Sequence, residues 1–136
     1  IANLASKKSK LKINANDDVN MSQSSNDVIP TAICISALID MNRLLLPNLD
    51  YLIKTIDLKM KQVKGNVKTG RTHLMDAMPV RFSQVISGWI AQVEHAESLL
   101  IYNQHQLQRL AIGGTAVGTG VNAPAGFAKD VEEVNQ

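Results

Sequence analysis

Two long segments with helical apolar periodicity constrain this chain more than any other feature. The spacing predicts two long helices, each with one apolar face. Two such faces exceed what so short a chain can cover, so we expect an all-α helical bundle completed by further helices. The apolar positions are Ala37, Met41, Leu45, Leu49, Leu52, Ile56, Met60 and Val63 in the first helix (about 28–63), and Phe82, Ile86, Trp89, Val93, Ala96, Leu100, Leu107 and Leu110 in the second (about 80–111).

Breaker residues divide the rest of the chain. Pro47 should bend or split the first helix, because proline removes a backbone donor and crowds the preceding turn. Residues 66–80 contain Gly70 and Pro79 and lack a long periodicity, so we expect an extended, partly ordered connection there. A last helix should begin near residues 124–126.

The two ends of the sequence predict that it is an incomplete piece of one helical domain. Residues 1–4 have the pattern of a helix tail, and the basic residues 6–12 that follow should be a solvated loop. Residues 131–136 resemble the first turns of another helix. We therefore expect residues 1–18 to end an N-terminal region and residues 19–136 to belong to a central helical-bundle region.

Composition favours a soluble, intracellular globular protein. Of the residues, 45% are hydrophobic and 19% charged, and a net charge of +2 with 4% aromatic residues does not point to nucleic-acid or membrane-surface partners. The single cysteine, Cys34, allows no internal disulfide. No apolar run is long enough to be expected to cross a bilayer, and no signal-peptide pattern opens the sequence.

Three polar segments interrupt the helical pattern, at residues 14–27, 70–76 and 113–122, each at the end of a predicted long helix. The first contains a run from Asn20 to Asp27 just before the apolar pattern begins. Its Ser, Asn and Asp residues suit a helix cap, and Pro30 should lie in the first turn. The same chemistry beside a helix N-terminus also suits an anionic ligand, so both interpretations stay open.

The chemistry of these segments favours a carboxylate ligand over a phosphate or a metal. The glycine-rich segment 113–122 allows close backbone approach or an irregular turn, but it lacks the Lys-Ser/Thr of a P-loop and follows no predicted strand. No metal-ligand spacing is present, and no cofactor is expected. His73 is the histidine in a polar segment, and imidazole can move protons near neutral pH. Arg71 either binds a carboxylate or holds the loop.

In their order and separations, four motifs resemble class II fumarase, the metal-independent fumarate hydratase of the fumarase/aspartase superfamily. They are Asp18-Val19-Asn20-Met21-Ser22-Gln23-Ser24-Ser25-Asn26-Asp27, Gly70-Arg71-Thr72-His73, Asp76-Ala77-Met78-Pro79 and the segment from Gly113 to Asn122. The resemblance extends to about Phe127. It implies a lyase of the tricarboxylic acid cycle that binds a small dicarboxylate and assembles as a homotetramer, with each active site shared between subunits. Such an enzyme is cytoplasmic, or mitochondrial in a eukaryote.

The resemblance also implies roles for individual residues. Ser24, Ser25, Asn26 and Thr72 match substrate-carboxylate binders, and His73 matches the histidine that positions or activates water and relays protons in the reversible anti hydration of fumarate to L-malate. Preorganised donors would stabilise the carbanion-like species of this reaction. A secondary carboxylate site is implied at Asn14, Ala15, Asn16 and Asp17, where the family commonly has His-Pro-Asn-Asp, so the missing histidine puts that site in doubt.

Other family elements are absent from these residues. They are the mobile signature loop with its general-base serine, the Ser-Gly-Thr ligand segment and the acidic partner of the histidine. The isolated chain is therefore expected to be inactive. Two alternatives remain. Aspartate ammonia-lyase or another superfamily lyase shares the scaffold, although Ser24-Ser25-Asn26 and His73 favour fumarase. A non-catalytic helical interaction protein would use the polar segments only as caps.

Overall fold

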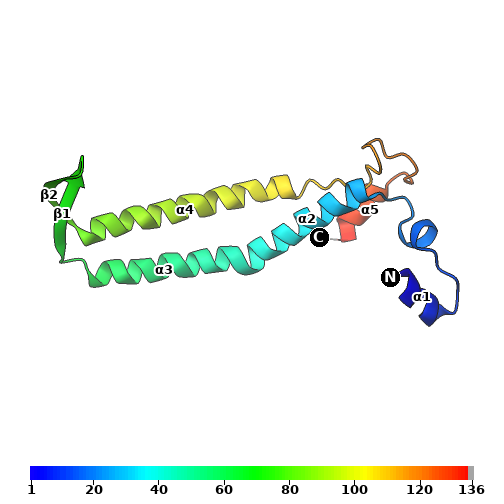
Figure 1. Cartoon of the computed structure of the whole chain (residues 1–136), viewed down its shortest axis with the longest axis horizontal. Helices are drawn as coiled ribbons and strands as arrows, with labels where there is room; N and C mark the ends of the chain where they lie inside the picture. Colours follow the sequence, from blue (N-terminus) through cyan, green and yellow to red (C-terminus); the bar gives the residue numbers. More distant parts are fainter. Residues whose placement is uncertain (135–136) are drawn as a thin grey trace. The chain divides into compact units, whose positions relative to one another are not determined.

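The structure, a computed structural model, describes residues 1–134, and most of them are helical. Contacts divide the chain into two units: unit 1 holds Ile1–Ser36 and the chain from Leu107 onward, and unit 2 holds Ala37–Gln106. The elements in chain order (Figure 1) are α1 (Ala2–Ser9), the π-helical turn η1 (Ala15–Val19), α2 (Ser25–Asp40), the π-helical segment η2 (Met41–Leu45), α3 (Leu46–Gln62), β1 (Val67–Thr72), β2 (Met75–Arg81), α4 (Phe82–Leu107) and α5 (Phe127–Val134).

The first predicted long helix is confirmed as a helical run from Ser25 to Gln62. The expected effect of Pro47 is also confirmed, because the regular α-helical pattern gives way to η2 directly before α3, which has Pro47 in its first turn. Side-chain amides support the helical carbonyls here: Asn48 Nδ2 donates to Leu44 O at 2.7 Å, and Asn42 Nδ2 donates to Leu38 O at 2.9 Å. The proline thus disturbs the helix without ending it.

Two expectations about this helical run are wrong. The helix begins at Ser25 rather than near residue 28, so Pro30 lies beyond the first turn. By length and composition, the run Ser25–Gln62 is also long and apolar enough to cross a membrane. The sequence expectation counted uninterrupted apolar runs, whereas a helix with a few interspersed polar residues meets the same test. A helix packed inside a soluble bundle meets it too, so this feature does not indicate a membrane partner.

Residues 67–81 form a β-hairpin, where an extended, partly ordered connection was expected. β1 pairs antiparallel with β2, with Val67 opposite Arg81 and Thr72 opposite Met75. His73 and Leu74 form the two-residue loop with φ values of 50° and 62°, the left-handed pair that a type I′ turn requires. The fold is thus predominantly helical but not purely α-helical. The hairpin was missed because its loop lacks the Asn-Gly or Asp-Gly signal of such turns.

Gly70 allows the strand irregularity between Thr69 and Arg71. A Cβ atom at Gly70 would lie 2.7 Å from the carbonyl oxygen of Met78 on the facing strand. Since real Cβ atoms do not approach backbone oxygens so closely, the irregular pairing of this hairpin depends on glycine.

The second predicted long helix is confirmed as α4, which follows β2 and runs back in the direction opposite to α3 (Figure 1). Gln104 Nε2 near its end donates to Asn42 Oδ1 at 3.0 Å and lies 3.5 Å from Met41 Sδ. This amide contact links the last turn of α4 to η2, at the end away from the hairpin.

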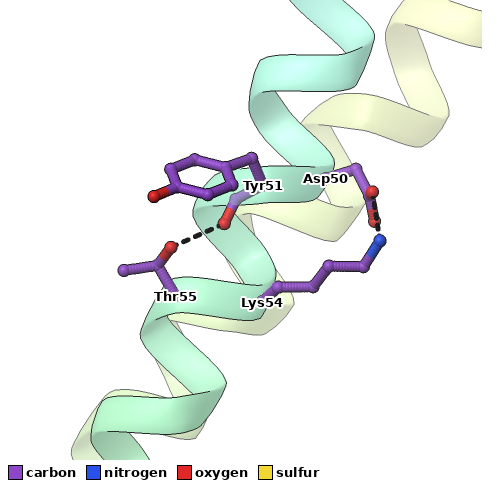
Figure 2. A network of polar contacts seen from close by, with 4 residues as sticks. All are labelled: Asp50, Tyr51, Lys54 and Thr55. Atoms are coloured by element: carbon purple, nitrogen blue, oxygen red, sulfur yellow. Dashed lines mark hydrogen bonds and ion pairs between the residues drawn. The ribbon is translucent and has the colours of Figure 1, made fainter.

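Exposed polar contacts join successive turns of α3 on two of its sides. Figure 2 shows Lys54 paired with Asp50, and Thr55 Oγ1 donating to Tyr51 O at 2.8 Å. An exposed ion pair of this spacing stabilises a helix by only about 0.3–0.5 kcal/mol. These contacts therefore contribute little to the fold.

Hydrophobic burial is sparse throughout the described residues, in which Ile86 on α4 is the buried apolar side chain. Large apolar side chains of unit 2 stay open to solvent, among them Leu58 (62% exposed), Trp89 (54%) and Tyr102 (74%). The helices therefore form without a core of their own. This agrees with the sequence argument that their apolar faces exceed what the chain can cover.

Unit 1 departs from the sequence expectations at its N-terminal end. Residues 6–9, expected in a solvated loop, complete α1, and the turn chemistry at 14–18 forms η1. The glycine-rich segment is an irregular loop, as expected, with positive φ at Gly113, Gly118 and Gly120. The last helix, α5, begins at Phe127, one residue beyond the expected range.

Candidate functional site

The start of α2 presents three of the predicted substrate-binding residues. Ser24 precedes the helix, and its Oγ accepts a hydrogen bond from Asn26 N at 3.2 Å, as an N-cap serine does. Because this oxygen acts as an acceptor here, its own proton remains available for a ligand. Ser25 and Asn26 are exposed on the first turn. The cap interpretation and the anion-site interpretation therefore apply to the same residues.

Asp27, which was not among the predicted site residues, is the buried centre of this region at 1% exposure. Its Oδ1 accepts from Ser24 N at 2.9 Å, and its Oδ2 accepts from Thr115 N at 2.8 Å. Burial raises the pKa of the carboxyl, but the backbone N–H groups of Ser24, Thr115, Val28 and Gly113 outweigh burial and lower the pKa below its ordinary value. Asp27 is thus held as a carboxylate by backbone donors.

A second hydrogen bond joins α2 to the glycine-rich loop, next to the bond between Asp27 and Thr115. Asn26 Nδ2 donates to Ala116 O at 2.8 Å. Together with the bond from Thr115 N to Asp27, it fixes two successive loop residues to two successive helix residues. The structure thus brings together two of the three polar segments, both within unit 1.

A pocket of about 630 Å³ lies between the start of α2 and this loop. Ser25, Asn26 and Asp27 line it from the helix, and residues 114–118 line it from the loop. Ile29, Pro30 and Ala111 add apolar lining. The backbone N–H groups of Ser24, Asn26 and Thr115 are already bonded to Asp27 or to Ser24 Oγ, so the donors that the pocket offers to a ligand are side chains, the Ser25 hydroxyl and the Asn26 amide. A hydroxyl and an amide can donate to a carboxylate oxygen.

The hydroxyl of Thr115, a pocket residue, is buried without a hydrogen-bond partner among the described residues. In the complete protein, Thr115→Val is expected to keep or raise the free energy of unfolding by about 1 kcal/mol, because it replaces an unpaired buried hydroxyl by a methyl group of the same shape. Urea unfolding measures the change. Thr119→Val, at an exposed position of the same loop, is the control and should change nothing. A loss above about 1 kcal/mol for Thr115→Val alone would mean that the hydroxyl has a partner.

Thr72 and His73 lie at the tip of the hairpin in unit 2, and both are exposed. His73 is the first of the two central residues of the type I′ turn, and its side chain is exposed at the tip of the hairpin. Within residues 1–134, no hydrogen bond or ion pair engages the imidazole. Arg71 Nε donates to Asp76 Oδ1 across the hairpin at 3.4 Å, which favours its loop-holding interpretation.

The predicted secondary site forms the start of η1. Asn14 Oδ1 accepts from Asn16 N at 2.9 Å and from Asp17 N at 3.5 Å, and Asp18 Oδ2 accepts from Asn14 N at 2.7 Å. Ala15 follows in the same turn, and the side chains of this turn are exposed. The amide oxygen of Asn14 is thus used to cap the turn, and the Asn14 and Asn16 NH₂ groups remain as donors.

Acidic, histidine and cysteine side chains do not gather as metal ligands in the part of the chain that the structure describes. The groups that gather in unit 1 are the buried Asp27 carboxylate, held by backbone N–H groups, and beside it the exposed Ser25 hydroxyl and Asn26 amide. Hydroxyl and amide donors can bind a carboxylate, and the hairpin in unit 2 carries an imidazole on a separate element.

Asp27 carried one sequence signal that could have identified it. Ser24-Ser25-Asn26-Asp27 has the spacing of a capping box, in which the acidic residue bonds back to the N–H of the cap serine. The link to Thr115 has no such signal, because it joins residues 88 positions apart.

Comparison with known proteins shows that this chain is similar to lyases. A family described as lyase matches residues 1–135. "Fumarate hydratase class II 2" of Pseudomonas aeruginosa is 54% identical over 133 residues, which cover 95% of this chain and 28% of the relative. "Fumarate hydratase class II" of Chlamydia pneumoniae is 47% identical over 123 residues, covering 90% of this chain and 27% of the relative. The chain thus spans little more than a quarter of the length of these relatives.

Solved structures give the same result. A recombinant class II fumarase from Schistosoma mansoni superposes with a TM-score of 0.84 at 30% identity, covering 99% of this chain and 32% of that one. A structure described as fumarate lyase:delta crystallin from Brucella melitensis, bound to cobalt, superposes with a TM-score of 0.87 at 33% identity, covering 98% of this chain and 31% of that one.

Proposed function

The chain belongs to this lyase family, and from that membership we propose that the complete protein is a class II fumarate hydratase. It would catalyse the reversible anti addition of water to fumarate, giving L-malate, with no cofactor. The observation that carries the proposal is the 54% identity over 95% of this chain to a relative named fumarate hydratase class II. Residues 1–136 would be part of one helical domain of a cytoplasmic enzyme, or a mitochondrial one in a eukaryote.

The pocket between α2 and the glycine-rich loop supports a carboxylate-binding role for Ser25 and Asn26, which line it, and Ser24 directly precedes them. Ser24 keeps a hydroxyl proton to donate, and Ser25 is exposed at the pocket wall. One N–H of the Asn26 amide is used by Ala116 O, which orients the group and leaves its second N–H for a ligand. In this proposal these donors bind one substrate carboxylate, and Thr72 supplies its hydroxyl to an active site that is shared between subunits.

In this proposal His73 acts on the water, the role that the family resemblance implies. Hydration adds a hydroxyl group to one alkene carbon and a proton to the other from the opposite face; the reverse reaction removes a proton beside a carboxylate. The electron pair left by that proton spreads into the carboxylate, so donors at the carboxylate stabilise the transition state more than the ground state. His73 would orient the water and take or return its proton.

The turn at Asn14, Ala15, Asn16 and Asp17 would provide a secondary carboxylate site outside this pocket. Its available donors are the side-chain NH₂ groups, because Asn14 Oδ1 is engaged by the backbone of Asn16 and Asp17. The site would lack the histidine that the family commonly places there.

Ultraviolet absorbance of fumarate tests the reaction directly in the complete protein. L-Malate should generate fumarate, and fumarate should be consumed, without added metal. Fumarate formed from L-aspartate but not from L-malate would assign the protein to the aspartate ammonia-lyases instead. Absence of both reactions would leave a non-catalytic helical interaction protein whose polar segments serve as caps.

The exposed apolar faces of α3 and α4 support assembly into a homotetramer with shared active sites. With Ile86 as the buried apolar residue of the described chain, these faces need other helices to cover them. Sedimentation of the complete protein should therefore give a species of about four chain masses. An active monomer would contradict both the assembly and the sharing of sites between subunits.

A further inference from the structure

We propose that Asp27 is a positioning residue that holds the glycine-rich loop against the start of α2 and so places Asn26 and Thr115 at the pocket. The nature of the ligand rests on the proposed function, whereas the anchoring itself rests on the contacts of Asp27. The residue contacts no substrate in this assignment and acts through its neighbours.

The two oxygens of Asp27 reach different parts of the chain. Oδ1 accepts from Ser24 N, which completes the helix cap, and Oδ2 accepts from Thr115 N in the loop. A helix cap alone needs only the first of these bonds. The second bond is therefore the feature that a purely local capping role leaves unexplained.

The hydrogen bond of Asn26 to the loop runs in the opposite direction to the bond of Asp27. At Asp27 the helix accepts from the loop, and at Asn26 the helix donates to the loop, through Ala116 O. A donor and an acceptor on adjacent residues fix both the position and the direction of the loop backbone. Loss of either bond would let the loop turn relative to the helix.

Thr115 in the loop has a strained backbone conformation. Its φ is 58°, in the left-handed region that β-branched residues disfavour. Such a conformation costs on the order of 1–3 kcal/mol and persists where the surroundings impose it. Its buried N–H meets the carboxylate, and its buried hydroxyl has no partner among the residues described. The strained backbone of Thr115 and its hydrogen bond to the Asp27 carboxylate therefore occur at the same residue, which lines the pocket.

Asp27→Asn in the complete protein tests the anchor, because it keeps the shape of the side chain and replaces one acceptor by an NH₂ donor that faces a backbone N–H. Two measurements follow. Hydrogen exchange of the amides in residues 113–118 should speed up on the order of tenfold or more, since their tie to α2 is lost. For the fully folded variant, kcat/KM for L-malate should fall on the order of 10²-fold, mainly through KM, because the carboxylate-binding groups are misplaced.

Asp50→Asn is the matched control, since it makes the same chemical change at an exposed helical aspartate on α3 and should leave both measurements at wild-type values. If Asp27→Asn does not fold, Asp27→Glu replaces it. Glutamate keeps the charge and suits the capping box, but its extra methylene displaces the loop. Its exchange should rise in residues 113–118 and not at Ser24.

The outcomes separate the anchor from the proposed function. Wild-type exchange in residues 113–118 together with wild-type KM in a folded Asp27→Asn protein would overturn the anchor. A fall in stability alone, with both readouts unchanged, would reduce Asp27 to a helix cap and overturn it as well. If the wild-type protein forms no fumarate, the proposed function fails, while faster exchange in the variant still supports the anchor.

Discussion

Replacement of His73 by Asn in the complete protein is expected to lower kcat for the interconversion of L-malate and fumarate by about 10²–10⁴-fold, the usual contribution of a positioned acid–base group. This substitution should remove the imidazole without disturbing the turn. His73 has a φ of 50° in a type I′ turn, and asparagine is the side chain that best tolerates that position. The hairpin should therefore keep its geometry, so that a lost rate reports the lost imidazole.

Leu74→Asn is the matched control, since Leu74 is the other central residue of the turn, with a φ of 62°, and carries no acid–base group. It should retain near wild-type kcat. Circular dichroism and sedimentation should show the fold and assembly unchanged in both variants. Wild-type kcat in His73→Asn would end the assignment of His73 to proton transfer.

Gly113→Ala is expected to cause the largest loss of stability, about 2–5 kcal/mol in the free energy of unfolding. Gly113 has a φ of 86°, and a Cβ atom there would lie 2.8 Å from the Cβ of Ala128 at the start of α5. Alanine therefore meets two penalties, a left-handed backbone and a clash with a short side chain that cannot rotate away. Urea unfolding of the complete protein gives the sum.

Two other glycines separate these penalties. Gly118 has a φ of 82° with nothing within 4 Å of the added Cβ, so Gly118→Ala should cost about 1–2 kcal/mol from the backbone alone. Gly65 has neither a left-handed φ nor a close neighbour, and Gly65→Ala should stay within about 0.5 kcal/mol of wild type. Equal losses for Gly113→Ala and Gly118→Ala would show that Ala128 yields without cost.

Periodicity and breaker residues predicted the long helices well, because these depend on local spacing. α4 spans Phe82–Leu107 where about 80–111 was expected, and Pro47 lies in the first turn of α3, directly after η2. The hairpin could not be found in the same way. Its turn consists of His73 and Leu74, which adopt positive φ without the residues that normally announce it.

In the candidate site, too, the residues with a local sequence signal were predicted and the residue that depends on a long-range contact was not. Ser24, Ser25 and Asn26 were predicted from cap chemistry and from the family resemblance, and the structure places Ser25 and Asn26 at a pocket, with Ser24 directly before them. Asp27 stands next to them in the sequence, yet its buried position follows from a contact with Thr115 in a distant segment. Long-range pairing of this kind has no local signal, so only the fold reveals it.

The nearly coreless pair of long helices has a consequence for the whole protein. Because the apolar side chains of α3 and α4, apart from Ile86, are only half-buried or exposed, much of the free energy that orders these helices must come from surfaces outside the described residues. In the proposed tetramer, the stability of these helices then depends on protein concentration. Dilution dissociates the subunits and so lowers the free energy of unfolding of the helices. The hairpin that carries His73 joins these same two helices, so in this proposal protein concentration also affects the order of the residue assigned to proton transfer.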